Sequence, residues 1–178
     1  MRTRSGRKRS SLKHLAHVRW FLSLMKQDKT TYFMKSALRQ AKKAALIDEV
    51  PIGCVIVKNG RIIAKGHNVR ESHLDPTGHA EMIAIRQAAR KLKSWRLNGC
   101  DLYVTIEPCS MCAGAIVLAR IDKVIFGASD PKGGALGSSY NLYEQPKLNH
   151  YPSVISGVMN SECQTMISNY FKTKRNQK

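Results

Sequence analysis

The stretch His79-Ala80-Glu81, followed farther along the chain by Pro108-Cys109-Ser110-Met111-Cys112, decides more about this sequence than any other part. It supplies one imidazole, two thiols and one carboxylate. An imidazole and two thiolates are ligands that zinc prefers. Three protein ligands leave a fourth tetrahedral position for water, which is the arrangement of a catalytic rather than a structural zinc site. We therefore expect one zinc ion per subunit, bound by His79, Cys109 and Cys112.

Both halves of this motif are predicted at the N-terminal ends of helices. Loop residues 75–78 precede a helical pattern from about His79 to Leu92, and a second helix is predicted from Pro108 to about Ala119, with proline in its first turn. A helix N-terminus carries partial positive charge and free N–H donors, so it lowers the pKa of nearby thiols and stabilises thiolates. Two cysteines three residues apart in a first turn can both reach one ion.

Glu81 is expected to move protons rather than to bind the metal. It is two residues from His79, so its side chain points in another direction. Zinc lowers the pKa of bound water to about 7. We expect the resulting hydroxide to attack a carbon that bears an exocyclic amine, with Glu81 as the carrier of water protons, first to the ring nitrogen and then to the departing amine. A structural site would need a fourth ligand, and the candidates Cys54 and Cys100 each lie in or beside a predicted strand.

The remaining pattern predicts an α/β fold. Helical spacing of apolar residues begins near Thr31, and the two-residue turn Asn59-Gly60 is typical of a hairpin. Strands are predicted at Ile52–Lys58, Arg61–His67, Leu102–Ile106, Val124–Ala128 and Val154–Val158, a glycine-rich loop at Asp130–Ser139, and a last helix at Cys163–Lys174. Strands that alternate with helices imply a three-layer α/β/α sandwich around a five-stranded mixed sheet, parallel where a helix joins two strands.

The chain is strongly basic, with 30 Lys and Arg against 12 Asp and Glu and a net charge of +18. Residues 1–24 contain seven of these cations and no acid, and the rest of the chain still carries +11. This charge predicts a polyanionic partner, RNA or DNA first, although basic proteins without such a partner also exist. No apolar run is long enough to span a bilayer.

Two parts are expected: a basic, disordered N-terminal extension at 1–27 and one domain at 28–178. The extension lacks the apolar centre and cleavage site of a secretory signal. It fits an organellar transit peptide, or sequence upstream of a natural start at Met25. Five cysteines, two of them at C-x-x-C spacing, favour metal or redox chemistry in a reducing compartment over a disulfide framework. Small core roles are expected for Cys54, Cys100 and Cys163.

Several segments carry a family resemblance. The pattern H-x-E…P-C-x-x-C is the signature of zinc-dependent nucleobase deaminases. Over about residues 30–175 the chain resembles the bacterial tRNA-specific adenosine deaminases of the cytidine deaminase-like superfamily. The matching segments are Gly66-His67-Asn68, Asp75–Glu81, Val104–Ala115, Phe126–Ala135 and Leu148-Asn149-His150. The first three belong to the wider superfamily, whereas the glycine-rich loop, the Asn-His pair and the basic last helix narrow the resemblance to the tRNA enzymes.

The resemblance implies a cytoplasmic homodimer that hydrolyses adenosine to inosine at the wobble position of a tRNA anticodon, chiefly in an arginine tRNA. It also implies roles for individual residues. Asn68 is expected to hydrogen-bond the flipped base, and Glu107 and the backbone around Ala80 are expected beside the pocket. The pocket wall is assigned to Ile52, Ile106 and Pro108, and contacts with anticodon nucleotides to Asp130 and Lys132.

The residues themselves leave alternatives open. Phe171 is included among the substrate-binding residues as a ring that could stack on a base, although its place in the last helix favours core packing. Asn68 also fits a turn residue, and Asp130 a residue that shapes its loop. The cluster Lys172–Lys178 fits phosphate contacts or a solvated terminus.

Two rival functions are a deaminase of free cytosine, cytidine or guanine, and a zinc-stabilised RNA-binding module without catalysis. The charge of +11 on residues 25–178 argues against the first. Glu81 argues against the second, because a structural zinc site has no use for that acid.

Overall fold

The computed structural model describes residues 28–177. The predicted N-terminal extension, 1–27, lies outside the described residues, so its boundary and its nature stay predictions. Two units are distinguished within the chain, Met1–Tyr32 and Phe33–Lys178, and the sheet with the helices that pack on it belongs to the second, which includes the first helix from Phe33 onward. Along the described part of the chain, no helix combines the length and the apolarity needed to cross a membrane.

The secondary structure follows the predicted order. A helix at 28–46 comes first. It is followed by β1 (Gly53–Lys58), β2 (Arg61–His67), α2 (Ala80–Leu92), β3 (Cys100–Ile106), α3 (Ser110–Leu118), β4 (Lys123–Ala128), the 3-10 turn η1 (Leu142–Glu144), β5 (Ser153–Ile155) and α4 (Asn160–Asn176).

Several predicted boundaries are wrong by a few residues. Helix α3 does not include Pro108, because Cys109 is its N-cap, with an extended backbone at φ −72° and ψ 173°. The last strand ends at Ile155 rather than Val158, and α4 begins at Asn160 rather than Cys163. Short elements and helix ends depend on tertiary contacts, so sequence patterns place them poorly.

The five strands form one mixed sheet in the order β2-β1-β3-β4-β5. β1 is antiparallel to both β2 and β3, while β4 is parallel to β3, to which α3 connects it, and to β5. The turn between β1 and β2 is the predicted two-residue turn, since Lys58 pairs with Arg61. Asn59 and Gly60 have φ values of 50° and 71°, which is the left-handed geometry of a type I′ hairpin turn.

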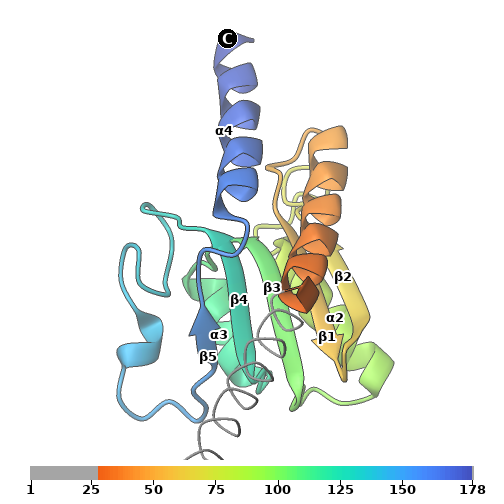
Figure 1. Cartoon of the computed structure of the whole chain (residues 1–178), viewed down its shortest axis with the longest axis vertical. Helices are drawn as coiled ribbons and strands as arrows, with labels where there is room; N and C mark the ends of the chain where they lie inside the picture. The colour runs from red at the N-terminus through yellow and green to blue at the C-terminus, as the bar shows by residue number, and fades with distance from the viewer. Residues whose placement is uncertain (1–27, 178) are drawn as a thin grey trace, which may run out of the picture. The chain divides into compact units, whose positions relative to one another are not determined.

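Helices cover both faces of the sheet, which confirms the three-layer prediction (Figure 1). Alternate residues of β1 face opposite sides, so Cys54 and Ile56 join the core under α2 and α3, while Val55 and Val57 join the core under the helix at 28–46 and α4. The three cysteines expected in the core, Cys54, Cys100 and Cys163, are all buried and free.

Close packing brings the end of β2 against the start of α2. A Cβ at Gly66 would lie 2.1 Å from the carbonyl oxygen of Ala80 and 2.9 Å from the amide nitrogen of Ala84, so only glycine allows this approach. The first turn of α2 therefore lies directly on the end of the hairpin.

Candidate active site

Three side chains from the starts of two helices meet in one cluster. His79 is the N-cap of α2, Cys109 is the N-cap of α3, and Cys112 lies in the first turn of α3. Nδ1 of His79 is 3.6 Å from Sγ of Cys109 and 3.6 Å from Sγ of Cys112. A tetrahedral zinc ion with bonds of about 2.3 Å to sulfur and about 2.05 Å to nitrogen separates the two kinds of atom by about 3.6 Å. The cluster therefore fits one zinc ion.

The cluster has three protein ligands, not four. Within residues 28–177, no further His, Cys, Asp or Glu joins His79, Cys109 and Cys112. Cys54, one candidate for a fourth ligand, has its thiol pKa raised by complete burial and by the nearby charge of Glu81, so it stays a neutral core thiol. An ion bound here would keep one position for a ligand from solvent, as catalytic zinc sites do.

The pKa values of the two thiols in the cluster are shifted in opposite directions. A hydrogen bond from Cys112, together with a weaker effect of one from His79, lowers the pKa of Cys109 to about 4. The same bond to Cys109, together with burial, raises the pKa of Cys112. The lowered thiol pKa expected at the start of α3 is therefore found at Cys109. Deprotonation of both accompanies metal binding.

Glu81 lies in the first turn of α2 and is only 3% exposed. Burial, with a contribution from the charge of Cys109, raises its pKa to about 7. Its Oε2 atom is buried and accepts no hydrogen bond from the described residues. A buried carboxyl oxygen without a partner is costly unless a ligand or water meets it. Oε2 of Glu81 is therefore available to a ligand or a water molecule.

Asn68 is held between the zinc cluster and the start of β1. Its backbone N–H donates to the carbonyl oxygen of Ile52 at 3.1 Å, and the N–H of Val69 donates to the carbonyl oxygen of Gly78, next to His79, at 2.9 Å. The side chain of Asn68 is buried, and its Nδ2 donates to Glu49 at 3.0 Å. This amide contacts a distant segment rather than its own backbone, so the turn interpretation does not describe it.

A groove of about 970 Å³ lies between the sheet and α4. Five of the predicted substrate-binding residues line it: Ile52, Ile106, Asp130, Lys132 and Phe171. Three others do not: Asn68, Ala80 and Pro108 are buried beside the groove or the zinc cluster.

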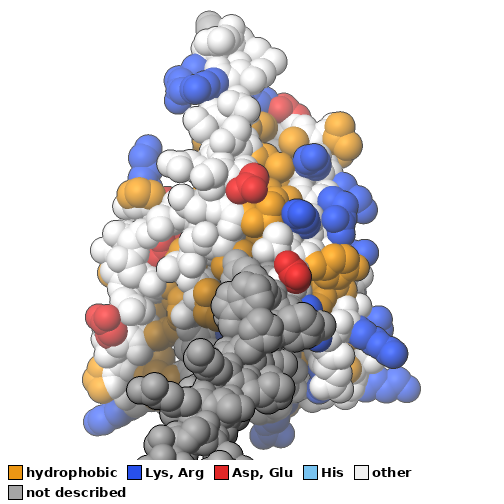
Figure 2. All heavy atoms as spheres, viewed as in Figure 1, with side chains coloured by type: hydrophobic (Ala, Val, Ile, Leu, Met, Phe, Trp, Pro, Cys, Tyr) orange, Lys and Arg blue, Asp and Glu red, His pale blue; other side chains and the backbone are white. Residues whose placement is uncertain are grey.

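Phe171 is 44% exposed, so the core-packing alternative for it is wrong. Its ring meets Tyr170 edge-on at 5.4 Å between centroids. Lys172 and Arg175 line the groove beside it, and both are exposed. Figure 2 shows Lys and Arg side chains on the upper part of α4 and along the helix at 28–46. The groove thus combines an exposed aromatic ring with cations, a combination that suits RNA.

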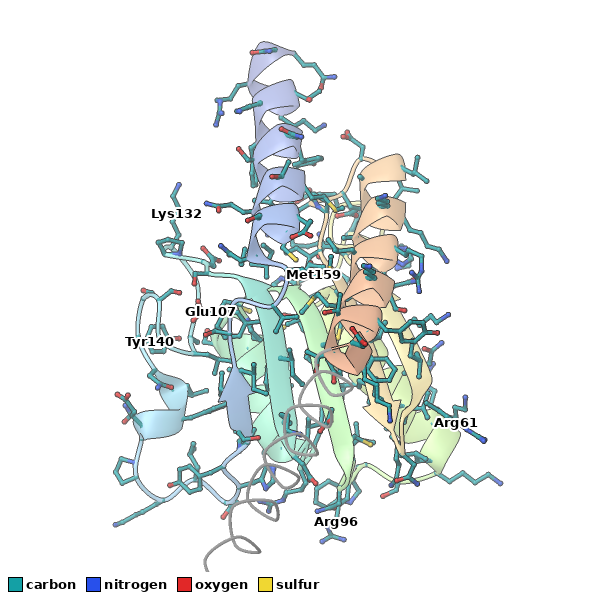
Figure 3. The ribbon with its side chains drawn as sticks, in the orientation of Figure 1. Arg61, Arg96, Glu107, Lys132, Tyr140 and Met159 are labelled. Atoms are coloured by element: carbon teal, nitrogen blue, oxygen red, sulfur yellow. The ribbon has the colours of Figure 1, made fainter. Side chains whose placement is uncertain are left out.

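Glu107 organises the loop that forms one wall of the groove. Its buried carboxylate accepts the N–H groups of Leu136 at 2.8 Å, Ser138 at 3.1 Å and Asp130 at 3.2 Å, and also the Ser138 hydroxyl. Burial alone would raise the pKa of Glu107, but these hydrogen bonds together lower it. In Figure 3, Glu107 lies beneath the loop while Lys132 extends outward from it. Asp130 also accepts the N–H of Lys132 at 3.0 Å, so Asp130 does shape its loop.

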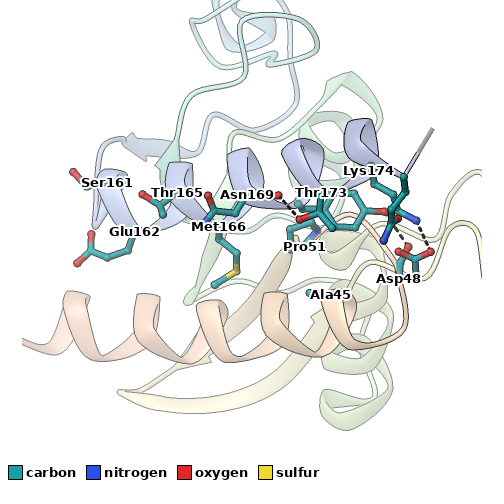
Figure 4. Close-up of a pocket in the computed structure, with 12 residues that line it drawn as sticks. Ala45, Asp48, Pro51, Ser161, Glu162, Thr165, Met166, Asn169, Thr173 and Lys174 are labelled. Atoms are coloured by element: carbon teal, nitrogen blue, oxygen red, sulfur yellow. Dashed lines mark hydrogen bonds and ion pairs between the residues drawn. The ribbon is translucent and has the colours of Figure 1, made fainter.

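A second hollow, of about 720 Å³, separates α4 from the end of the helix at 28–46 (Figure 4). At one end of it, the Tyr170 hydroxyl donates to the Asp48 carbonyl oxygen at 3.0 Å, and Lys174 forms an ion pair with the Asp48 carboxylate at 2.5 Å. These contacts use one face of α4. The neighbouring face, with Phe171 and Arg175, is thereby turned toward the groove.

Sequence reasoning missed one buried acid, Glu49. It is fully buried and bonded to Asn68 and Ser72. The only signal was an acidic residue directly before the Val50-Pro51 step at the start of β1, and an acid at a helix end normally indicates a solvated turn.

Comparisons with known proteins agree with this geometry. The family model for the cytidine and deoxycytidylate deaminase zinc-binding region matches residues 27–128. The tRNA-specific adenosine deaminase of Bacillus subtilis (strain 168) is 51% identical over 146 residues, covering 82% of this chain and 91% of that protein. That of Aquifex aeolicus (strain VF5) is 49% identical over 151 residues, with 82% and 95% covered.

A solved structure of a tRNA deaminase is also similar to this chain. It comes from a study of A-to-I editing by tRNA:A34 deaminases at the wobble position of transfer RNA, and it is 47% identical to this chain, with a TM-score of 0.73. The match covers 76% of this chain and 99% of that one. The chain therefore belongs to the zinc-binding cytidine and deoxycytidylate deaminase family and, within it, to the tRNA-specific adenosine deaminases.

Proposed function

We propose that this protein hydrolyses adenosine to inosine and ammonia at the wobble position of a tRNA anticodon, chiefly in an arginine tRNA. One observation carries the chemistry: the unpartnered buried Oε2 of Glu81, beside a three-ligand cluster that leaves one coordination position open. The identity of 51% to a tRNA-specific adenosine deaminase supports the choice of substrate.

The residues of the cluster divide the work. His79, Cys109 and Cys112 would hold zinc, which supplies a Lewis acid that lowers the pKa of a coordinated water. Glu81 accepts one proton from the water and delivers it to the ring nitrogen, and it then carries the second proton, from the hydroxyl on the attacked carbon, to the amine, which departs as ammonia. Because its pKa is raised to about 7, the same carboxyl can act first as a base and then as an acid near neutral pH.

The surroundings of the cluster suit a base that has left its stack. A buried carboxyl can act only on a nucleotide turned out of the strand, and anticodon loops present such unstacked bases. Asn68 is proposed to bind the base, and Ala80, Pro108, Ile52 and Ile106 to enclose it. The neighbouring nucleotides are proposed to lie in the groove, against Asp130, Lys132 and Phe171, with phosphates near Lys172 and Arg175.

We also propose that the protein is a cytoplasmic homodimer. Apolar side chains next to the zinc helices support an interface: Leu74, in the loop before α2, is 90% exposed, and Leu118, at the end of α3, is 69% exposed. Light scattering of the purified protein tests the dimer. A cytoplasmic location follows from the proposed tRNA substrate.

Sequencing of tRNA after incubation with the purified protein tests the function. We expect A to be read as G at the wobble position, first in an arginine tRNA. Turnover of free adenosine, cytidine or guanine at the rate seen with an anticodon stem-loop would instead support the free-base or nucleoside deaminase.

A further inference from the structure

Glu49 is a buried acid that the proposed chemistry does not use. It follows the helix at 28–46 and is fully buried. Its Oε2 accepts from Asn68 Nδ2 at 3.0 Å, and its Oε1 accepts the N–H of Ser72 at 2.7 Å. A buried carboxylate needs such donors. Glu49 thus joins the end of the first helix to the residue after β2 and to the loop before α2.

The bond to Glu49 determines how the Asn68 amide is turned. Both oxygens of Glu49 accept a hydrogen bond, Oε1 from the N–H of Ser72 and Oε2 from Asn68, so Asn68 directs its NH₂ group toward Glu49. The opposite orientation would place Oδ1 against a carboxylate oxygen. Oδ1 and the second hydrogen of Nδ2 are therefore the groups that Glu49 leaves for another partner. An asparagine can offer adenine one acceptor and one donor together.

Asn68 lies between the groove and the zinc cluster, so the orientation of its amide can affect a bound base. Its backbone is bonded to Ile52, which lines the groove, and the next residue is bonded to Gly78, beside the zinc ligand His79. Glu49 itself does not line the groove and does not belong to the zinc cluster. Any effect of Glu49 on a bound base must therefore pass through the residues that it holds, Asn68 or the loop at Ser72.

We propose that Glu49 is a positioning residue of the substrate site, which fixes the Asn68 amide in the single orientation that receives the base. This inference rests on the proposed function. The rival is a purely structural role, in which Glu49 only secures the loop before α2 through Ser72.

The variant Glu49→Gln separates the two roles. Glutamine keeps an acceptor oxygen for Ser72, and its NH₂ group can donate to Asn68 Oδ1 once the asparagine amide turns over. The fold is thus retained while the orientation of Asn68 is reversed. Glu71→Gln is the matched control, because it removes the same charge from the loop that Glu49 holds, and the exposed Glu71 side chain is bonded to Arg70 alone among the described residues.

The measurement is kcat/KM on an anticodon stem-loop with adenosine at the wobble position, with zinc content and melting temperature measured in parallel. Glu49→Gln should lower kcat/KM about tenfold, the effect of one misdirected hydrogen bond, with zinc retained, and Glu71→Gln should match the wild type. In an Asn68→Ala background, Glu49→Gln should cause no further loss. If Asn68→Ala has no measurable turnover, the same comparison is made on the Kd of the labelled stem-loop.

Three outcomes would overturn the inference: unchanged kcat/KM in Glu49→Gln, an equal loss in the Asn68→Ala background, or loss of zinc and of melting temperature in step with activity. Failure of the proposed function looks different, because the wild type itself would then neither bind nor deaminate the stem-loop.

Discussion

Replacing Glu107 by Gln should loosen the loop at Asp130–Ser139. Oε1 of Glu107 accepts the N–H groups of Leu136 and Ser138, and Oε2 accepts the N–H of Asp130 and the Ser138 hydroxyl. Glutamine has one acceptor oxygen, so two of these donors would face an NH₂ group whichever way the amide is turned. Hydrogen bonds to a charged acceptor contribute about 1.5–3 kcal/mol each.

The magnitude depends on which donors water can reach. Ser138 is exposed and can be rehydrated, whereas Leu136 is only 7% exposed. The amide therefore keeps its oxygen on Leu136 and turns its NH₂ group toward the half-buried Asp130 N–H. We expect a loss in the free energy of unfolding of about 2–3 kcal/mol, from that unmet donor and from the lost charge on the remaining hydrogen bonds. For a protein of this size that corresponds to a fall in melting temperature of roughly 4–12 °C.

Urea unfolding followed by circular dichroism measures this change. Glu144→Gln is the control, because Glu144 is exposed, accepts only from Asn141 Nδ2 and loses the same charge. Glu107→Gln should also raise KM for the stem-loop, since Asp130 and Lys132 belong to the loop. A change below about 0.5 kcal/mol, equal to that of the control, would show that the loop does not depend on this carboxylate.

Three further predictions concern the groove, the metal and the loop before α2. Phe171→Ala should raise KM for the stem-loop about 5- to 150-fold through lost stacking and should leave the zinc content unchanged. The same KM as the wild type would show that Phe171 does not contact the RNA. Cys112→Ser should abolish deamination and lower the melting temperature, and so should dialysis of the wild type against a chelator. Added zinc should restore the dialysed wild type but not the variant. Activity at full rate in metal-free protein would contradict the zinc assignment. Hydrogen bonds from the Thr77 hydroxyl and N–H lower the pKa of Asp75 below 3.8, so its stabilising contribution is complete above that pH and is lost as pH falls through the lowered value. An NMR titration of Thr77→Ala should show the Asp75 pKa moving back up, and no movement would contradict the assigned cause.

The zinc motif was predictable because its chemistry is local. His79 and Glu81 follow one loop and begin α2, while Cys109 and Cys112 follow another loop and begin α3. Helix α3 connects the parallel strands β3 and β4, and α2 and α3 pack on the same face of the sheet. The order of elements was predictable for a similar reason, since apolar spacing with periods of two and 3.6 is repeated along the chain.

The supporting contacts were not predictable, because they join segments far apart in the sequence. Glu49 and Asn68 are 19 residues apart, and Glu107 and Ser138 are 31 apart. No local pattern says that an acid at a helix end will be buried or which amide it will bind. The exposure of Phe171 likewise depends on how α4 is held by Asp48, which only the tertiary structure shows.

The central claim is that Glu81 moves protons beside a zinc ion that it does not bind, and the variant Glu81→Gln tests it most directly. Purified wild type and variant are compared in metal content and in single-turnover conversion of adenosine to inosine in the anticodon stem-loop. We expect one zinc per chain in both proteins, equal RNA binding, and a rate at least about a hundredfold lower in the variant. Conversion at the wild-type rate, or loss of zinc from the variant, would contradict the role assigned to Glu81.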